Sequence, residues 1–457
     1  MNIKIKVNFK EAAWIQKFQN GKMVINTHQL YIYLKNNYHL FVTRNCNNYL
    51  YHNGVYHLIN DVELKAFIKN FLPEEFRTRK NWEDVFEEFK TDNPIEDDCL
   101  NADENIINFK NGIYDISENK LKEHSPDILS TIQIPCNYIE TAILDNAPIF
   151  KKYLNDLQGE DDITKKFLLE YIGAIISNVH GSRFKKVLLL VGKGNTGKTQ
   201  LREFVISLIG SQNNISIDLK NLNEPFGVAN LANKRLGGSG DMSYAKVSEI
   251  NVLKELTGGD DIYANIKYKP QFSFKYNGFL WFNCNDLPLF GGDNGEHVYE
   301  RFMVVTCNNV IPKEKRDSFL LKKLLSEKDI VASVCVKHFR LAIKRGYKFT
   351  ESEAMEIDRD LYRIQNNNLL TFIKENCTVG IGRTTRAEFN VRYSNWCHVN
   401  NFKPVGRNRI SKIMTEEHGI NQLKSNGHIY YELTLKPDFC DEQEKEFHQE
   451  KQIRDMY

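Results

Sequence analysis

Residues Val187–Gly210 read VLLLVGKGNTGKTQLREFVISLIG, and this stretch decides the fold class of the chain. Five apolar residues predict a buried strand over Val187–Val191, and the spacing of later apolar residues predicts a helix over Gln200–Ile209 that starts at Lys198. Between them, Gly192–Thr199 matches G-x-x-x-x-G-K-[ST] at every fixed position. A strand, a glycine-rich loop and a helix in this order predict a site for nucleotide phosphates.

Each part of this loop has a chemical task in such a site. The glycines let backbone N–H groups converge on a phosphate, and the helix N-terminus adds positive potential. Lys198 would reach the β- and γ-phosphates, and the Thr199 hydroxyl would complete the shell of a Mg²⁺ ion. The sequence therefore predicts ATP and Mg²⁺ as cofactors, held by Gly192, Gly194, Asn195, Thr196, Gly197, Lys198 and Thr199.

Two other interpretations fit part of the loop. Gly192, Gly194 and Gly197 also match the G-x-G-x-x-G fingerprint of dinucleotide-binding proteins, but that motif does not need a Lys-Thr pair. No acidic residue ends a second strand at the usual offset of about 20 residues. A glycine-rich turn without a ligand is the structural alternative. The complete motif in its strand–loop–helix context favours nucleotide binding.

Further strands and helices alternate around the loop. Arg235–Gly238 predicts the end of a weak strand, whereas Phe279–Asn283 and Phe302–Val305 predict stronger ones. This alternation predicts an α/β domain with a mostly parallel sheet and helices on both faces. We place this P-loop domain at residues 181–350 and a helical collar before it at residues 147–180.

Three polar residues downstream of the loop are candidates for the chemistry. Asp241 follows a glycine-rich strand end, where an acid would bind Mg²⁺ and face the attacking water. Asn285 follows the FLWF strand, where its amide would orient water, and Arg301 opens the next strand, where it would act as an arginine finger on a neighbouring subunit. The alternatives are turn residues for Asp241 and Asn285 and a surface ion pair for Arg301.

A basic hairpin interrupts the α/β pattern. Ile262–Ala264 and Phe272–Phe274 flank the segment NIKYKPQ, which predicts two paired strands with Lys267, Tyr268 and Lys269 near the tip. Two lysines around an aromatic ring suit DNA, because the ammonium groups pair with phosphates and the ring contacts a base or sugar. A solvated basic hairpin is the alternative.

The region after Asn366 carries a basic excess. Residues 366–436 contain ten Lys and Arg against five Asp and Glu, whereas the acidic tail 437–457 contains three against seven. The pattern predicts three helices and a hairpin turning at Asn426-Gly427, an order that resembles a winged-helix DNA-binding domain. The alternative is a protein–protein module. The candidate DNA contacts are Arg407, Asn408, Arg409 and Lys412 at a helix start and Lys424 beside the turn.

Residues 1–146 predict an α+β domain. The segment LYHNGVYHLI around Gly54 predicts a hairpin, and Asp61–Phe89 has a helix-like pattern broken at Pro73. No acidic metal triad of a primase stands in this region. We therefore expect the domain to serve assembly or contact with DNA or with a separate primase.

Size and composition suit a multidomain protein of the cytoplasm. The 457 residues allow about three domains, and a net charge of +2 indicates no class of partner. No apolar run reaches the about 18 residues that span a bilayer, and the N-terminus lacks the pattern of a secretory signal. The nine cysteines show no C-x-x-C spacing, which argues against a disulfide framework and a zinc site.

The order of these motifs resembles the superfamily 3 helicases. The loop GKGNTGKT is followed by KRLGGSGD, LTGGD, the lysine-tipped hairpin, FNCNDLP and an ERF strand. NIINFKNGIYDI and LLEYIGAIIS upstream extend the similarity, over Asn105–Val305, to the branch associated with poxvirus and phage primases. Within that branch the chain is most similar to the replication initiator helicases of phage satellites and chromosomal pathogenicity islands.

The resemblance implies an AAA+ ATPase that assembles as a homo-hexameric ring and moves along single-stranded DNA. Many members have paired acids at Walker B, whereas Gly240 stands before the acid here, so the residue that activates water is open and Glu249 is a remote candidate. The roles implied are Walker B acid for Asp241, sensor 1 for Asn285, arginine finger for Arg301, and DNA contacts in the channel for Lys267 and Lys269.

Together these features predict an ATP-dependent DNA helicase that initiates replication of a mobile genetic element. It would bind an origin through the winged helix, unwind DNA as a ring, and work with a separate primase or single-strand binding protein. Two alternatives stay open: an ATP-switched DNA-binding regulator without unwinding activity, and a small-molecule kinase. The lysine-tipped hairpin speaks against the regulator, and the basic winged helix speaks against the kinase.

Overall fold

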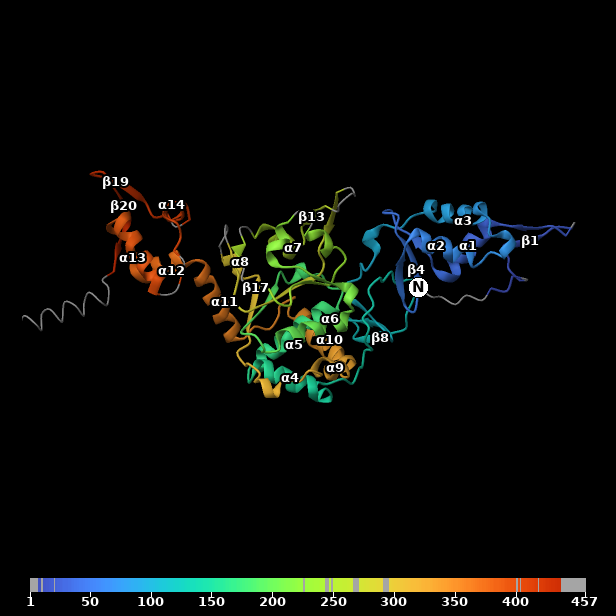
Figure 1. The fold of residues 1–457 in the computed structure, drawn as a ribbon, viewed down its shortest axis with the longest axis horizontal. Helices are drawn as coiled ribbons and strands as arrows, with labels where there is room; N and C mark the ends of the chain where they lie inside the picture. The colour runs from blue at the N-terminus through green and yellow to red at the C-terminus, as the bar shows by residue number, and fades with distance from the viewer. Residues whose placement is uncertain are drawn as a thin grey trace, which may run out of the picture. The chain divides into compact units, whose positions relative to one another are not determined.

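A computed structural model describes residues 7–436, except residues 10, 20, 225–226, 243–245, 248–249, 266–270, 291–295, 400–401, 403 and 418 (Figure 1). The chain divides into two compact units. The first unit holds residues 1–245, 251–286 and 303–355, and the second holds residues 246–250, 287–302 and 356–457. Separate hydrophobic cores form within residues 14–89, 107–355 and 369–433.

The N-terminal core packs two small antiparallel sheets against helices. The predicted hairpin is confirmed, because the strands on either side of Asn53-Gly54 pair antiparallel and both turn residues have positive φ, 51° and 84°. The sheets consist of β1 (Ile15–Lys17) with β2 (Met23–Ile25), and of β3 (Phe41–Val42), β4 (Asn48–His52) and β5 (Val55–Ile59).

Local sequence signals set the helices of this core, α1 (Thr27–Tyr38), α2 (Asp61–Lys69) and α3 (Arg79–Thr91). Helix α2 starts with a capping box, since Asn60 accepts from the Glu63 N–H and the Glu63 carboxylate accepts from the Asn60 N–H. The break expected at Pro73 is confirmed: it lies between α2 and α3, just before a short 3-10 turn.

The next sheet belongs to the large core of the first unit. It consists of β6 (Ile106–Phe109), β7 (Gly112–Asp115) and β8 (Lys120–Lys122). Its buried residues share one core with α4 (Pro148–Gln158), α5 (Asp162–Ile176) and α10 (Lys328–Lys344). The domain boundary at residue 146 stays a prediction, but the buried clusters change earlier in the chain, between Phe89 and Ile107.

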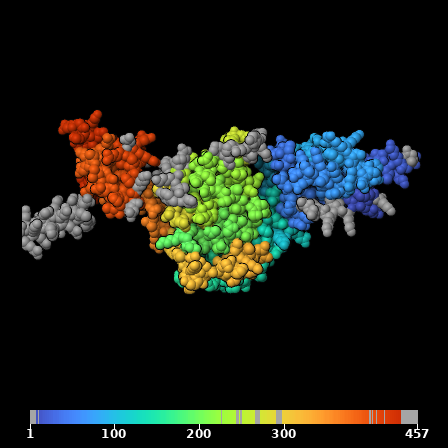
Figure 2. All heavy atoms as spheres, in the orientation of Figure 1, coloured from blue at the N-terminus to red at the C-terminus, as the bar shows by residue number. Residues whose placement is uncertain are grey.

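Helices that are distant in sequence pack closely in this core. A Cβ atom on Gly173 of α5 would lie 2.2 Å from the carbonyl oxygen of Cys335 on α10, so only glycine fits there. The Glu327 carboxylate, at the start of α10, accepts from the N–H groups of Ile149 (3.0 Å) and Phe150 (2.8 Å) in the first turn of α4. It caps a helix that has no side-chain cap of its own. In Figure 2 the orange surface at the bottom of the central part includes α9 (Leu320–Leu325), which contacts α4.

A five-stranded sheet in the order β10–β11–β15–β9–β17 forms the centre of the α/β domain. The pairs β10–β11, β11–β15 and β15–β9 are parallel, which confirms the expected mostly parallel sheet. The strands are β9 (Val187–Val191), β10 (Asn214–Ser216), β11 (Leu236–Gly238), β15 (Phe279–Cys284) and β17 (Phe302–Thr306).

The strands predicted for this domain, including the weak one at Arg235–Gly238, are confirmed. The four predicted strands correspond to β9, β11, β15 and β17, and helix α6 (Lys198–Ile209) begins at Lys198. Strand β10 carries no signal of its own, because its three residues, Asn-Ile-Ser, are too few for an alternating pattern. Its position follows from parallel pairing with β11.

The second unit includes short segments at residues 246–250 and 287–302 and most of α11 (Glu353–Asn366). Most of the segment between the two predicted domains, residues 351–365, thus forms a helix. Tyr362 of α11 is fully buried, its hydroxyl donates to the Pro288 carbonyl at 2.7 Å, and its ring packs edge-on against Tyr299 and Phe302. The short segments contain β12 (Lys246–Val247), β16 (Leu289–Phe290) and α8 (Glu296–Tyr299).

The C-terminal core alternates helices with a small antiparallel sheet. The three predicted helices are present, and the predicted hairpin turns at Asn426-Gly427 with φ values of 47° and 79°. Strand β18 is an addition, and it pairs with β20 so that the sheet order is β18–β20–β19. The elements are α12 (Asn368–Asn376), β18 (Cys377–Thr385), α13 (Arg386–Val399), α14 (Arg407–Lys412), β19 (Gln422–Ser425) and β20 (His428–Leu435).

None of the helices in the described part of the chain combines the length and the apolar character that a membrane crossing needs. The longest apolar helices, α5 and α10, contribute instead to the large core.

Candidate nucleotide-binding site

The loop between β9 and α6 has a backbone that requires glycine. Gly192 and Gly197 have φ values of 148° and 103°, and Asn195 has 66°. A Cβ atom on Gly192 would lie 2.2 Å from the carbonyl oxygen of Cys307. The first glycine of the motif is therefore required by the backbone that packs against it.

Lys198 turns back into the loop. Its side chain is almost fully buried, with 7% exposed, although it carries a charge. The ammonium group donates to the carbonyl oxygens of Gly192 and Lys193 (2.9 Å) and to Oγ1 of Thr196 (3.3 Å). Its charge thus lies within the loop at the N-terminus of α6, where an anionic phosphate would be attracted.

The acid Asp241 is brought to the same end of the sheet. The Thr199 hydroxyl donates to the carbonyl oxygen of Gly240 at 3.3 Å, so the first turn of α6 contacts the residue before Asp241. The Asp241 side chain itself is exposed. The structure therefore brings Thr199 and the Asp241 segment together, as a shared Mg²⁺ ion requires.

Asn283 is a site residue that sequence reasoning missed. It lies at 1% exposure on β15, and its amide Nδ2 donates to Gly240 at 3.2 Å. Its Oδ1 accepts from the indole N–H of Trp281 at 2.7 Å, while its backbone bonds to Ser239 and Met242. The only signal in the sequence is a polar residue within an apolar strand, which does not reveal its partner.

Asn285 and Arg301 were the other predicted catalytic residues. Asn285 is exposed directly after β15, and Cys284 before it accepts a hydrogen bond from the Gly192 N–H at 3.2 Å. Asn285 thus follows a residue that touches the loop. Arg301 belongs to the second unit, where its Nη1 donates to the carbonyl of His297 at 2.7 Å.

Arg202 was also missed by sequence reasoning. It stands one turn after Lys198 and is 2% exposed. Its Nη2 donates to Oδ1 of Asn214 (3.1 Å) and to the carbonyl of Gly238 (2.8 Å), so it ties α6 to β10 and β11. Burial lowers the pKa of its guanidinium group. This buried cation supports the last residue of β11, the strand that leads to Asp241.

Two cysteines flank the loop without contributing a nucleophile. Burial raises the pKa of the Cys284 and Cys307 thiols to about 12, although the positive charge of Lys198 acts against this shift. Both thiols are therefore protonated at neutral pH, and the chemistry of the site rests on its charged and hydroxyl groups.

The predicted DNA contacts lie on two parts of the chain. Strands β13 (Asp261–Ala264) and β14 (Phe272–Lys275) pair antiparallel, which confirms the strands of the predicted hairpin. Its tip residues Lys267, Tyr268 and Lys269 lie outside the described residues. In the C-terminal core the side chains of Arg407, Arg409, Lys412 and Lys424 are exposed, and that of Asn408 lies outside the described residues.

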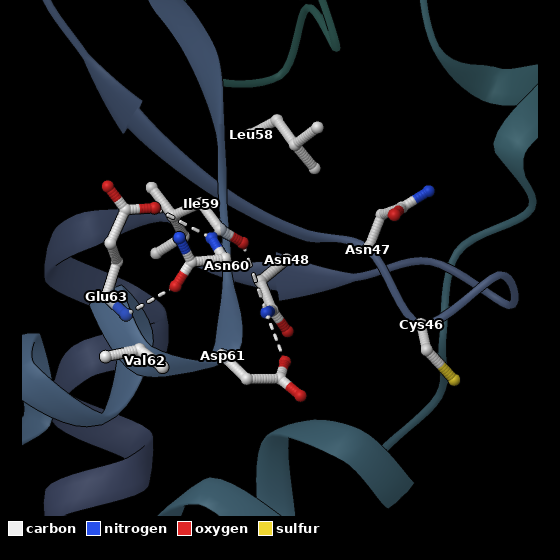
Figure 3. A pocket seen from close by; sticks show the side chains of 9 residues that line it. All are labelled: Cys46, Asn47, Asn48, Leu58, Ile59, Asn60, Asp61, Val62 and Glu63. Atoms are coloured by element: carbon white, nitrogen blue, oxygen red, sulfur yellow. Dashed lines mark hydrogen bonds between the residues drawn. The ribbon is translucent and has the colours of Figure 1, made fainter.

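A surface hollow of about 910 Å³ lies away from the loop, in the N-terminal core (Figure 3). Its polar side chains already serve the fold: Asn48 donates to Asp61 at 2.9 Å, and Asn60 and Glu63 form the capping box of α2. Among the described residues no group of three or more His, Cys, Asp or Glu side chains is placed to hold a metal ion. The phosphate loop is therefore the main candidate site.

Comparison with known proteins gives two family matches. Residues 15–159 match the family described as "D5 N terminal like", and residues 190–318 match the "Family of unknown function (DUF5906)". Each match covers less than half of the chain.

Viral proteins named as helicases are among the relatives. The chain is 25% identical over 236 residues to "Putative helicase L207/L206" of Acanthamoeba polyphaga mimivirus and 24% identical over 253 residues to "Putative helicase 184R" of Invertebrate iridescent virus 6. These matches cover 49% of this chain but only 24% and 25% of the viral proteins. The chain thus spans about a quarter of the length of these relatives.

The fold is similar to that of a solved structure, the C-terminal region of NrS-1. The TM-score is 0.51 at 15% identity, and the match covers 89% of this chain and 98% of the other. At this identity the likeness concerns the fold alone. The family matches and viral relatives support similarity to a primase/helicase-like family.

Proposed function

We propose that this chain is an ATP-dependent DNA helicase of the replication-initiator kind. One observation carries the proposal: Lys198 lies within the phosphate loop while Thr199 reaches the Gly240 carbonyl beside Asp241. A strand-borne acid next to the loop is what ATP hydrolysis requires. The similarity to viral proteins named as helicases favours DNA unwinding as the use of that energy.

The residues of the loop fit a nucleotide with Mg²⁺. Lys198 and the backbone N–H groups of the loop would hold the phosphates, and Thr199 and Asp241 would hold the ion. When bound, Mg²⁺ offsets the negative charge that develops on the phosphate oxygens. Asn285 would orient water, and Arg301 would act on the site of a neighbouring subunit.

The sheet order supports an AAA+ arrangement. Strand β15 lies between β9, which leads into the loop, and β11, which leads to Asp241. Asn285, directly after β15, therefore emerges between the two halves of the site, as sensor 1 of the resembled family would. The homo-hexameric ring is part of the same proposal and rests on that resemblance.

The C-terminal core supports a winged-helix interpretation. Its elements follow the order helix, strand, helix, helix, strand, strand, and its central strand β20 pairs with both β18 and β19. Arg407 and Arg409 are exposed at the start of α14, where a recognition helix presents its first residues to the major groove. We propose that this core binds origin duplex.

The test is strand displacement on a forked DNA duplex with ATP and Mg²⁺. We expect the wild type to separate the strands and Lys198→Ala to leave them paired. ATP hydrolysis without strand separation, in the presence of a single-strand binding protein and a primase, would favour the ATP-switched regulator instead.

A second test concerns the hairpin. Lys267→Ala together with Lys269→Ala should stop unwinding while ATP is still hydrolysed in the absence of DNA, because the hairpin strands lie outside the phosphate loop. Unwinding at the wild-type rate by the double variant would remove the motor role of these lysines.

A further inference from the structure

Helix α4 contacts the phosphate loop at Gly197. The hydroxyl of Tyr153 on α4 donates to the carbonyl oxygen of Gly197 at 2.8 Å. A Cβ atom on Gly197 would lie 3.3 Å from the Cε2 atom of the Tyr153 ring, so the ring and the loop are in tight contact. Tyr153 is 4% exposed, and burial holds the pKa of its hydroxyl well above the usual value. The group is therefore a permanent donor.

This hydrogen bond fixes the direction of the next N–H group. A peptide unit is planar and trans, so the C=O of Gly197 and the N–H of Lys198 point in opposite directions. The same carbonyl also accepts the N–H of Leu201 at 3.2 Å. The Lys198 N–H therefore points away from Tyr153, toward the side on which phosphates would lie.

A second peptide plane of the loop is held in the same way. The N–H of Ile311 donates to the carbonyl of Asn195 at 2.9 Å, which orients the N–H of Thr196. Two donors of the loop are thus aimed by groups outside the sequence motif.

The support itself is anchored at both ends of α4. Glu327 caps its first turn. In its last turn, Asp156 accepts from Asn309 through its carbonyl at 2.7 Å, and Gln158 donates to Sγ of Cys307 at 3.3 Å. Both contacts reach residues 307–311, the segment whose Ile311 N–H donates to Asn195. Helix α4 and this segment are therefore bonded to each other as well as to the loop.

We propose that Tyr153 is a positioning residue of the nucleotide site, which acts through Gly197 to aim the Lys198 N–H at the phosphates. The inference rests on the proposed nucleotide binding and adds a residue that no motif contains. ATP and ADP share the β-phosphate that the helix N-terminus would bind. Loss of the Tyr153 hydroxyl should therefore weaken the binding of both by a similar factor.

The test uses Tyr153→Phe, which keeps the ring and removes only the hydroxyl. We expect the Kd values for fluorescent ATP and ADP analogues, with Mg²⁺, to rise by about 5-fold, the size of one lost hydrogen bond. The KM for ATP should rise with them, and kcat should change by less than about 2-fold, because the contact is equal in the ground and transition states.

The matched control is Tyr56→Phe, which removes a buried hydroxyl that donates to the Pro126 carbonyl at 2.7 Å, away from the loop. It should leave both Kd values at the wild-type level. Melting temperatures without nucleotide report any general loss of stability. Glu327→Gln, which weakens the cap of α4 with Tyr153 intact, should raise the Kd values in the same direction by a smaller factor.

The outcomes separate this role from the nucleotide site itself. If the wild type binds neither analogue, the nucleotide site is wrong and the role of Tyr153 falls with it. If the wild type binds and Tyr153→Phe binds equally well, only the role of Tyr153 is overturned. An equal rise in Kd for Tyr56→Phe would also overturn it, because the effect would then reflect stability alone.

Discussion

The phosphate loop and the C-terminal core both present positive charge, but they hold it in different ways. In the loop, Lys198 is buried and its ammonium group is surrounded by oxygen atoms of the loop. In the C-terminal core, Arg407 and Arg409 extend from a helix start into solvent. A buried charge interacts strongly with the groups directly beside it, because little water screens it. The interactions of an exposed charge are weakened by water and salt.

The two regions therefore depend on the rest of the fold to different degrees. The position of the Lys198 ammonium group depends on a loop that several strands and helices support, including β15 and α4. The C-terminal core needs only a stable helix that exposes its basic residues. Substitutions should therefore affect chemistry and stability in the first region, and affinity and its salt dependence in the second.

The largest effect is expected at Lys198. Lys198→Ala should lower the rate of ATP hydrolysis by about 100-fold or more, because a pre-placed charge next to the phosphates is lost. The release of phosphate measures it. Lys193→Ala is the matched control, since this lysine of the same loop has an exposed side chain. An equal loss of ATP hydrolysis in both variants would show that the buried Lys198 is no more important for the reaction than the exposed Lys193.

Buried charge should also matter for stability. Arg235, directly before β11, is 3% exposed and donates to the backbone carbonyls of Ala174, Ile175, Val179 and Asn277. Arg235→Met removes one donor from each of these carbonyls and should lower the free energy of unfolding by about 3 kcal/mol.

Urea unfolding at pH 7 measures this change. The neighbouring Lys234, whose ammonium group contacts the Gln212 carbonyl at the surface, provides the control. Lys234→Met should cost about 1 kcal/mol or less. Equal losses of unfolding free energy in the two variants would show that a buried cation contributes no more to stability here than an exposed one.

The exposed charges should act on DNA alone. Arg407→Ala together with Arg409→Ala should weaken binding to origin duplex by about 10-fold and lower the slope of log K against log salt by about 2. Fluorescence anisotropy at several salt concentrations gives both values. An unchanged slope would mean that these residues do not face phosphates, and would favour a protein partner for this core.

The smallest effect concerns pH. Burial alone would raise the pKa of Asp115 on β7, but hydrogen bonds from the Glu118 N–H, from Ser117 and from Lys122 outweigh it and hold the pKa well below 3.8. A carboxyl whose pKa is depressed in the folded state stabilises the fold above its unfolded pKa and loses this contribution as the pH falls.

Asp115 should therefore add to the loss of stability below about pH 4. In urea unfolding at pH 7 and pH 3, Asp115→Asn should be less stable than the wild type at pH 7 and closer to it at pH 3. A constant difference between the two proteins at both pH values would contradict the assignment.

Much of the fold follows from local sequence. The four predicted strands, of which β11 has the weakest signal, the helix start at Lys198, the hairpins at Asn53-Gly54 and Asn426-Gly427, and the break at Pro73 all depend on neighbouring residues. Short-range signals such as periodicity, turn residues and proline are contained within about ten residues, so they are readable without a structure. The strands β10 and β18 lack such signals, because one is very short and the other contains two glycines with positive φ.

The residues of the candidate site likewise fall into those that local sequence predicts and those that it does not. The phosphate loop can be predicted from local sequence, since its glycines, Lys198 and Thr199 stand at a fixed spacing. The groups that support it follow from the packing of distant segments: Tyr153 bonds to Gly197, Asn283 to Gly240, and Arg202 to Gly238 of β11. These residues come from helices and strands whose approach depends on the packing of a whole core, and a hydrogen bond across that core leaves no periodic trace in the chain.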